Sequence, residues 1–158
     1  MLLFIIECWS LNVFWVIFLF CLGLFYGNFL EYIIHRYAFH KMGRKKDSIF
    51  RYHLKGHHVL SKKQGFVDLT ESKVESFGLL LLIIFHIPLY FLVFPLWMGV
   101  TLYALAFKFM HGFQHKNPEW TQKWMKWHWD HHMSSPNHNF GVVAPWCDHL
   151  FGTRKIIK

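Results

Sequence analysis

The chain has 158 residues, of which 54% are hydrophobic, 20% are aromatic and only 16% are charged. This length predicts a single domain, residues 1–158, and the shortage of charge, against about 25% in average soluble proteins, indicates a membrane protein. A net charge of +8 is also compatible with nucleic-acid binding. Basic cytoplasmic loops account for the same excess, so we expect no nucleic-acid partner.

The basic residues are confined to two windows of the sequence. All 17 lie within residues 36–73 and 108–158, whereas the remaining residues carry only Glu7, Glu31 and Glu75 as charges. Basic segments of membrane proteins stay on the cytoplasmic side. The pattern therefore predicts that both basic windows and the C-terminus face the cytoplasm.

The first apolar stretch, residues 2–30, is longer than the roughly 20 residues that a transmembrane helix needs. It lacks a basic start and is too long for the apolar core of a signal peptide. We expect a retained membrane anchor that is tilted, or that starts at the interface near Ser10–Asn12. Its N-terminus is expected outside the cytoplasm.

The second apolar stretch, residues 77–109, is interrupted by Pro88 and Pro95. It predicts two spans, 77–94 and 96–114, in a hairpin whose tip faces away from the cytoplasm; an interfacial or re-entrant hairpin is the alternative. The polar segments 41–75 and 116–158 cannot lie exposed in lipid. The predicted fold is an all-α integral membrane protein with about three transmembrane helices and a cytoplasmic, histidine-rich helical cap.

Ten of the 13 histidines fall into four short clusters, each in the cap or at the cytoplasmic end of a span. The clusters are HRYAFH (His35 and His40), HLKGHH (His53, His57 and His58), HGFQH (His111 and His115) and HWDHH (His128, His131 and His132). Four clusters on one side of one membrane indicate a metal site rather than scattered surface imidazoles.

Helical geometry predicts which imidazoles converge. His111 and His115 are four residues apart and project from one face of a helix. The three histidines of HWDHH fall within a wedge roughly 100° wide, so that three ligands converge from one helix. His35 and His40 diverge by about 140° on a regular helix. We expect them to bind two different ions, or one ion if the helix ends or bulges between them.

The number and type of these side chains predict a dinuclear site. Neutral imidazole suits zinc, iron, copper and nickel, whereas the few carboxylates nearby make Mg²⁺ and Ca²⁺ poor fits. Because one ion takes about four to six ligands, ten histidines predict two ions. We expect His86, His138 and His149 to support the fold or the ligands rather than to bind metal.

The order and separation of the clusters resemble those of the fatty acid hydroxylase and sterol desaturase superfamily of membrane enzymes. After HWDHH, the run NFGVVAPWCDHLFGTR is similar to the closing stretch of that superfamily, and the resemblance covers residues 27–154. Two features depart from the common pattern. The second cluster is spaced HxxxHH, which makes His53 the least secure ligand, and the chain has room for about three spans where larger members have four.

The resemblance implies a dinuclear metal centre bound by all ten clustered histidines, which are also the expected catalytic residues. It implies two iron ions, with zinc acquired in purified protein as a variant, and O₂ as co-substrate. The expected reaction is hydroxylation of a C–H bond in a membrane lipid such as an acyl chain, a sterol or a carotenoid. A lipid desaturase with the same centre is the main alternative, followed by a non-enzymatic metal- or haem-binding membrane protein.

Other residues are expected to support this chemistry. The candidates for accepting the outer N–H groups of the ligands are Glu31, Asp130, Asn139 and Asp148, and those for walling the site are Phe113, Trp124, Trp127, Trp129 and Phe140. The chain carries no haem, iron–sulfur or dinucleotide motif, so a separate electron-transfer protein is expected. The basic cap (Lys41, Arg44, Lys45, Lys46, Lys62 and Lys63) attracts anionic lipid headgroups or an acidic partner. A homo-oligomer is an option if a second subunit completes the substrate tunnel.

Overall fold

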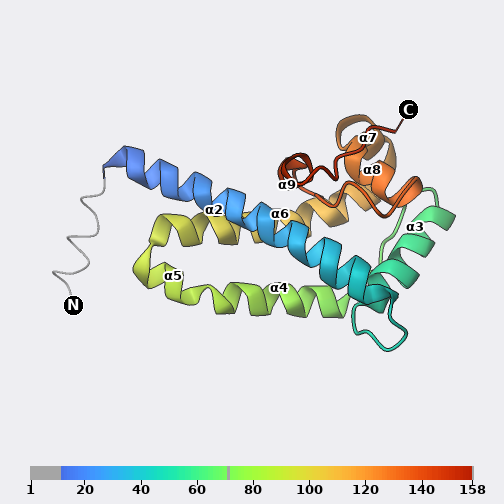
Figure 1. The fold of residues 1–158 in the computed structure, drawn as a ribbon, viewed down its shortest axis with the longest axis horizontal. Coiled ribbons are helices and arrows are strands. Elements are labelled where there is room, and N and C mark those ends of the chain that lie inside the picture. The colour runs from blue at the N-terminus through green and yellow to red at the C-terminus, as the bar shows by residue number, and fades with distance from the viewer. Residues whose placement is uncertain (1–11, 71, 158) are drawn as a thin grey trace.

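The computed structural model describes residues 12–70 and 72–157, and within them every regular element is a helix (Figure 1). The predicted start of the first span, with Ser10, lies outside the described residues. The elements are α2 (Val13–Ile33), η1 (Ile34–Lys41), η2 (Met42–Arg44), η3 (His53–His57), α3 (His58–Lys63), α4 (Lys73–Phe85), α5 (Ile87–Leu92), α6 (Phe94–Lys116), α7 (Pro118–Trp124), α8 (Lys126–Met133) and α9 (Trp146–Leu150).

Local sequence signals place the starts of the long helices. The Asn12 side chain accepts a hydrogen bond from the Phe14 N–H and caps α2. The hydroxyl of Ser72 accepts the N–H of Glu75, the first half of a capping box at the start of α4. Proline, which suits the first helical turn, lies near the start of α5, α6 and α7.

The predicted helical hairpin is present. The helices α4 and α5 run away from the cap and α6 returns to it alongside α2 (Figure 1). The short elements α3, α7, α8 and α9 gather at the end of the molecule where α2 and α6 finish. This arrangement brings all four histidine clusters to one end of the long helices.

Two helices among the described residues are long and apolar enough to cross a membrane, Val13–Arg44 and Lys73–Leu92. They correspond to the first and second predicted spans. The third predicted span, now α6, is not among them, so a count of three spans stays a prediction. The structure therefore agrees with the all-helical fold and with two candidate spans.

Glycines allow α2 and α6 to pack backbone against backbone. A Cβ atom added to Gly23 would lie 2.3 Å from the carbonyl oxygen of Leu96, and one added to Gly99 would lie 2.3 Å from that of Phe20. Small residues at such crossings permit close helix packing in membranes. The contact fixes α2, which continues into the η1 segment with His35, against α6, which carries His111.

We expect Gly23→Leu to destabilise the protein, because no side chain fits between these backbones. Overpacking of this kind costs about 1–3 kcal/mol or more, which thermal unfolding in detergent would measure as a lower Tm. Gly78→Ala is the matched control, since an added Cβ there meets no atom within 4 Å. A Gly23→Leu protein as stable as the control would contradict this packing.

Candidate metal centre

Nine of the ten clustered histidines form two compact groups. The first group is His35, His40, His53, His58 and His131, and the second group is His57, His111, His115 and His132. Within each group, one nitrogen from every residue lies within 4.8 Å of all the others. All members are buried except His111, which is partly buried. The chain thus folds its clusters into two potential metal sites.

The first group depends on a local departure from α-helical geometry. Residues Ile34–Lys41 form a π-helix, whose hydrogen bonds join residues five apart. This winding brings His35 and His40 onto one side, with their Nε2 atoms 3.2 Å apart. The structure therefore realises the bulged alternative, in which both residues belong to one histidine group.

A second π-helix, His53–His57, divides the HLKGHH cluster. His53 and His58, five residues apart, both join the first group, whereas His57 joins the second. The HxxxHH spacing is accommodated by this winding, and His53, the least secure ligand by sequence, lies fully inside the first group. Its side chain is buried.

Hydrogen bonds leave bare nitrogens at the centre of the first group. The Nδ1 of His35 donates to the Phe140 carbonyl at 2.5 Å, and the Nδ1 of His53 donates to the Glu75 carboxylate at 2.9 Å. In the neutral tautomers these bonds imply, each Nε2 carries only a lone pair. Yet these two Nε2 atoms lie 3.0 Å apart. Two lone pairs at this distance repel unless a cation lies between or beside them, so the donor set fits a metal ion.

The second group has the same character. The Nδ1 of His57 donates to Asp68 at 2.6 Å, and the Nδ1 of His115 donates to the Phe66 carbonyl at 2.8 Å. The Nε2 of His115 is buried without a hydrogen-bond partner, as are both ring nitrogens of His132. Buried polar atoms without partners are uncommon, and a metal ion would satisfy them.

His128 lies beside the second group but is not one of its members. Its ring centroid is 4.7 Å from that of His132, and its Nδ1 hydrogen-bonds to the buried Gln114 side chain. Its Nε2 is buried without a partner. The role of His128 as a ligand stays a prediction.

The three histidines outside the clusters lie apart from both groups. His86 bonds the Leu82 carbonyl at 2.7 Å and approaches the Tyr26 hydroxyl at 3.3 Å, as expected of a structural residue. His138 offers its backbone carbonyl to the Nδ1 of His131 at 2.6 Å. His149 is exposed.

Burial keeps the cap histidines in their neutral, metal-binding form. Desolvation lowers the pKa of four of them well below the ordinary value of 6.5, and neighbouring imidazoles lower it further. The four are His53, His58, His131 and His132. Their lone pairs are therefore free for a metal at neutral pH.

We expect the metal-free protein to lose stability below pH 6.5. There the unfolded chain binds protons that the buried, neutral histidines exclude, so acid favours unfolding by about 1 kcal/mol per histidine for each pH unit, down to the folded pKa. Thermal unfolding of chelator-treated protein at pH 7.5 and 5.5 would measure this. An unchanged Tm would contradict the neutral burial of these rings.

Three comparisons with known proteins bear on this arrangement. Residues 20–153, most of the chain, match the sequence model described as fatty acid hydroxylase. The chain belongs to the fatty acid hydroxylase family. The resemblance carried by the histidine clusters and the closing stretch is thereby confirmed.

Two matches place this family member beside a yeast protein. It is 28% identical over 155 residues to the ceramide very long chain fatty acid hydroxylase SCS7 of Saccharomyces cerevisiae. This alignment covers 91% of this chain and 40% of the yeast protein. It also matches the solved structure of full-length scs7p, of which only the hydroxylase domain is visible, with a TM-score of 0.64 and 26% identity over 97% of this chain and 61% of that one. This chain thus spans about 40% of the length of its curated relative.

The outer hydrogen bonds of this hydroxylase-family site come from residues that the sequence did not predict as acceptors, apart from His138, which was expected to support the fold or the ligands. Side chains of Glu75, Asp68 and Gln114 accept the Nδ1 protons of His53, His57 and His128, and the carbonyls of Phe66, His138 and Phe140 accept those of His115, His131 and His35. Burial alone would raise the pKa of Asp68, but hydrogen bonds from His57 and Thr70 lower it to about 2. Asp68 is therefore ionised at neutral pH.

The four acceptors predicted from sequence are wrong, because each is engaged elsewhere. Asp148 accepts the backbone N–H groups of Phe140 and Gly141 at 2.9 and 2.7 Å. Glu31 accepts the Val142 N–H at 2.5 Å and the Tyr103 hydroxyl. Asp130 bonds Lys126, and Asn139 bonds the chain at Arg154 and Lys155. Glu31 and Asp148 instead hold the backbone of the closing segment 138–154 in place. The carbonyls of Phe140 and His138 in this segment orient His35 and His131.

Aromatic rings enclose the two groups, though only one of the predicted five does so directly. Phe140 lies 5.5–6.0 Å, centroid to centroid, from three rings of the first group. Phe39 stacks on His53 at 4.7 Å, and Phe66 stacks on His115 at 4.4 Å. Trp124 is exposed, and Trp129 reaches the site only through Phe66. Phe39 and Phe66 carried no sequence signal.

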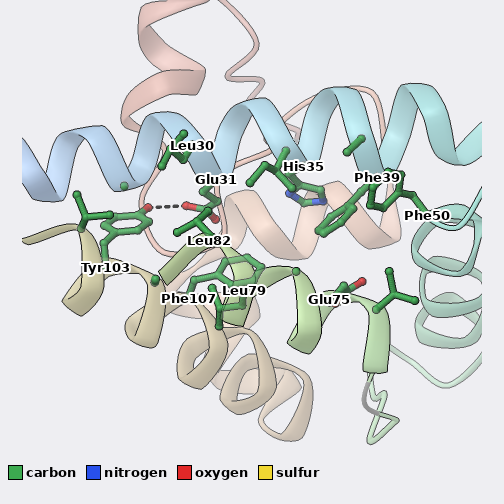
Figure 2. Close-up of a pocket in the computed structure, with 17 residues that line it drawn as sticks. Leu30, Glu31, His35, Phe39, Phe50, Glu75, Leu79, Leu82, Tyr103 and Phe107 are labelled. Carbon is green, nitrogen blue, oxygen red and sulfur yellow. Dashed lines mark hydrogen bonds between the residues drawn. The ribbon is translucent and has the colours of Figure 1, made fainter. Parts of the chain in front are cut away.

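An apolar cavity of about 250 Å³ opens between α2, α4 and α6, and His35 of the first group lines it (Figure 2). Its wall is almost entirely aliphatic and aromatic, including Leu30, Leu79, Leu82 and Phe107. His35 lines the cavity along its wall, between Glu31 and Phe39 (Figure 2). The site of this family member therefore joins nitrogen donors to a space that suits a hydrocarbon chain.

We expect Asp68→Ala to weaken metal binding at the second group. Loss of the partner of a ligating histidine typically lowers affinity about 10–100-fold, and Asp68→Asn should cost less because its amide oxygen still accepts the Nδ1 proton. Titration with zinc against a competing chelator measures the effect. Asp47→Ala, at an exposed carboxylate, is the control; an Asp68→Ala protein with the affinity of this control would contradict the role of the bond.

Proposed function

We propose that this protein hydroxylates a C–H bond of a membrane lipid, using O₂ and two iron ions held by its ten clustered histidines. The observation that carries the proposal is the apolar cavity lined by His35, a member of a group whose ring nitrogens converge. Membership of the fatty acid hydroxylase family supports the same conclusion.

Neutral imidazoles bind iron well, so the donor set is compatible with this metal. The lack of direct carboxylate ligands among the described residues disfavours Mg²⁺ and Ca²⁺. When bound, the two ions would supply the activation of O₂ and the oxidation of the C–H bond. The role of the protein chain is to hold the histidine ligands in position. Fixed outer hydrogen bonds orient His35, His53 and His57, and the burial of His35 and His53 keeps bulk water from the first group.

The substrate would be a lipid that places an acyl chain in the cavity. A saturated chain offers no polar group, so its position is determined by the shape of the wall formed by α2, α4 and α6. The similarity to a ceramide very long chain fatty acid hydroxylase supports an acyl chain over a sterol or carotenoid. The chain end near His35 would present its C–H bond to the first group.

The reaction R–H + O₂ + 2 e⁻ + 2 H⁺ → R–OH + H₂O requires an external source of electrons. We assign this role to a separate electron-transfer protein. The exposed basic residues of the cap offer it an electrostatic docking surface, and they also suit anionic headgroups. In the topology we propose, three helices span the membrane and the cap faces the cytoplasm.

The test is incubation of the purified, iron-loaded protein with lipid, a reductant, an electron carrier and isotopically labelled O₂. Hydroxylation predicts a lipid that gains one labelled oxygen atom, seen by mass spectrometry. A lipid that loses two hydrogens without gaining oxygen would establish the desaturase alternative instead. An unchanged lipid pool with a fully iron-loaded protein would contradict both.

A further inference from the structure

The two histidine groups are reached by two different hollows. The apolar cavity touches the first group through His35, whereas a smaller hollow of about 70 Å³ touches the second group through His57, His111 and His115. Leu79, Phe107 and Glu75 line both hollows, so the two hollows lie next to each other at these residues. We call the smaller hollow the polar cleft.

The walls of the polar cleft carry hydrogen-bonding groups. Tyr52, Asp68, Thr70, Ser72 and Lys108 all line it. The hydroxyls of Tyr52 and Thr70 lie 2.6 Å apart, and that of Thr70 donates to Asp68 at 2.6 Å. Tyr52 and Thr70 are exposed, so this chain of hydrogen bonds leads from solvent to the carboxylate that holds His57. A hollow with several polar partners holds water, whereas an apolar one stays dry.

We propose that the polar cleft is an aqueous port to the second histidine group, through which water and small hydrophilic ions reach the metal centre. The lipid chain uses the apolar cavity instead. What the port carries in turnover rests on the proposed function, because the hydroxylation consumes two protons and releases one water for each lipid oxidised. A site enclosed by lipid and apolar side chains needs such a polar route for both.

The wall between the two hollows explains how the lipid side stays dry. Phe107 stacks on His111 with ring centroids 5.6 Å apart, and Leu79 faces it from α4. Together these side chains place apolar surface between the cleft and the cavity. Glu75 lies at the same boundary, but its carboxylate is held by His53. Water that enters the cleft therefore meets the second group first.

Two glycines allow each hollow to be closed separately. Gly112 lines the polar cleft and Gly78 lines the apolar cavity, and a Cβ added at either position meets no atom within 4 Å. Both lie on exposed helix surfaces, so a larger side chain is accommodated without displacing the backbone. Gly112→Phe should close the cleft, and Gly78→Phe should close the cavity.

The experiment uses the full chain in detergent, loaded with cobalt(II), whose visible absorption reports its ligands. Azide is the probe, because this small anion passes through a water-filled route but not through an apolar cavity. We expect azide to alter the wild-type spectrum and to bind about tenfold more slowly in Gly112→Phe, which corresponds to ~1.4 kcal/mol on the access barrier. Gly78→Phe and Gly112→Ala, which leaves the cleft open, should react at the wild-type rate.

The possible results separate the port from the proposed function. Equal azide rates in wild type and Gly112→Phe, or a slower rate only in Gly78→Phe, would overturn the port. A two-cobalt wild-type protein that shows no spectral response to azide would do the same while leaving the metal centre in place. A protein that takes up no cobalt at either group would overturn the proposed function, and the port with it.

Discussion

Replacement of His131 by alanine should reduce lipid hydroxylation by more than about a hundredfold. Loss of a residue that only hydrogen-bonds to a metal ligand costs up to about a hundredfold in affinity or activity, and loss of a ligand itself should cost more. His131 is fully buried in the first group, its Nε2 lies 3.0 Å from that of His40, and its Nδ1 is fixed by the His138 carbonyl. Product formation, measured by mass spectrometry of the lipid, is the readout.

His149→Ala is the matched control, because this histidine is exposed and lies outside both groups. Its activity and its metal content should equal those of the wild type. A His131→Ala protein that keeps wild-type activity would show that the first group is not the reacting centre.

Closing the apolar cavity should abolish turnover while leaving the metal in place. We expect Gly78→Phe to lower hydroxylation by about a hundredfold, since even a displacement of about 1 Å of a reacting group can cost this much. The new ring would occupy the space beside Leu79 and Leu82 that the acyl chain needs. Activity and metal content, measured on the same preparation, separate this effect from unfolding.

Gly78→Ala adds only one methyl group at the same position and is the control for the helix itself. It should retain most of the activity, because its Cβ meets nothing within 4 Å. Wild-type activity in Gly78→Phe would mean that the lipid reaches the first group by another path.

Much of the fold could be predicted from sequence because its signals are local. The apolar stretches, the prolines near the start of α5 and α6, and the gathering of basic residues and histidines at one end are all visible in the chain. The hairpin spans, expected at 77–94 and 96–114, match α4–α5 and α6 closely. Hydropathy and helix-breaking residues act over a few turns, so they need no tertiary information.

The grouping of the ligands could be predicted only in part. The i,i+4 pair His111 and His115 does share the second group, as regular helical geometry requires. The divergence of His35 and His40 that a regular α-helix predicts is not observed, because this segment forms a π-helix. In HWDHH, convergence on one face was expected, yet His131 and His132 face different groups. The helix α8 packs against α3 and α7, and this tertiary packing, which the spacing of the histidines does not reveal, decides the division.

The outer hydrogen bonds were the least predictable part of the site. Asp68 lies 11 residues from His57, and Glu75 lies 22 residues from His53. Three further partners are backbone carbonyls, which every residue possesses. Proximity in sequence pointed to Glu31, one turn before His35, but its two oxygens accept the Val142 N–H of the closing segment and the Tyr103 hydroxyl of α6. Only the folded chain distinguishes these cases.

The metal-to-protein ratio tests the central claim most directly. The protein should be produced with iron in the medium, purified in detergent without chelators, and analysed at once by atomic spectrometry. The two histidine groups predict about two ions per chain, as iron or as zinc acquired during production. Less than one ion per chain in the freshly purified wild type would contradict a dinuclear centre, and the proposed hydroxylation would lose its chemical basis.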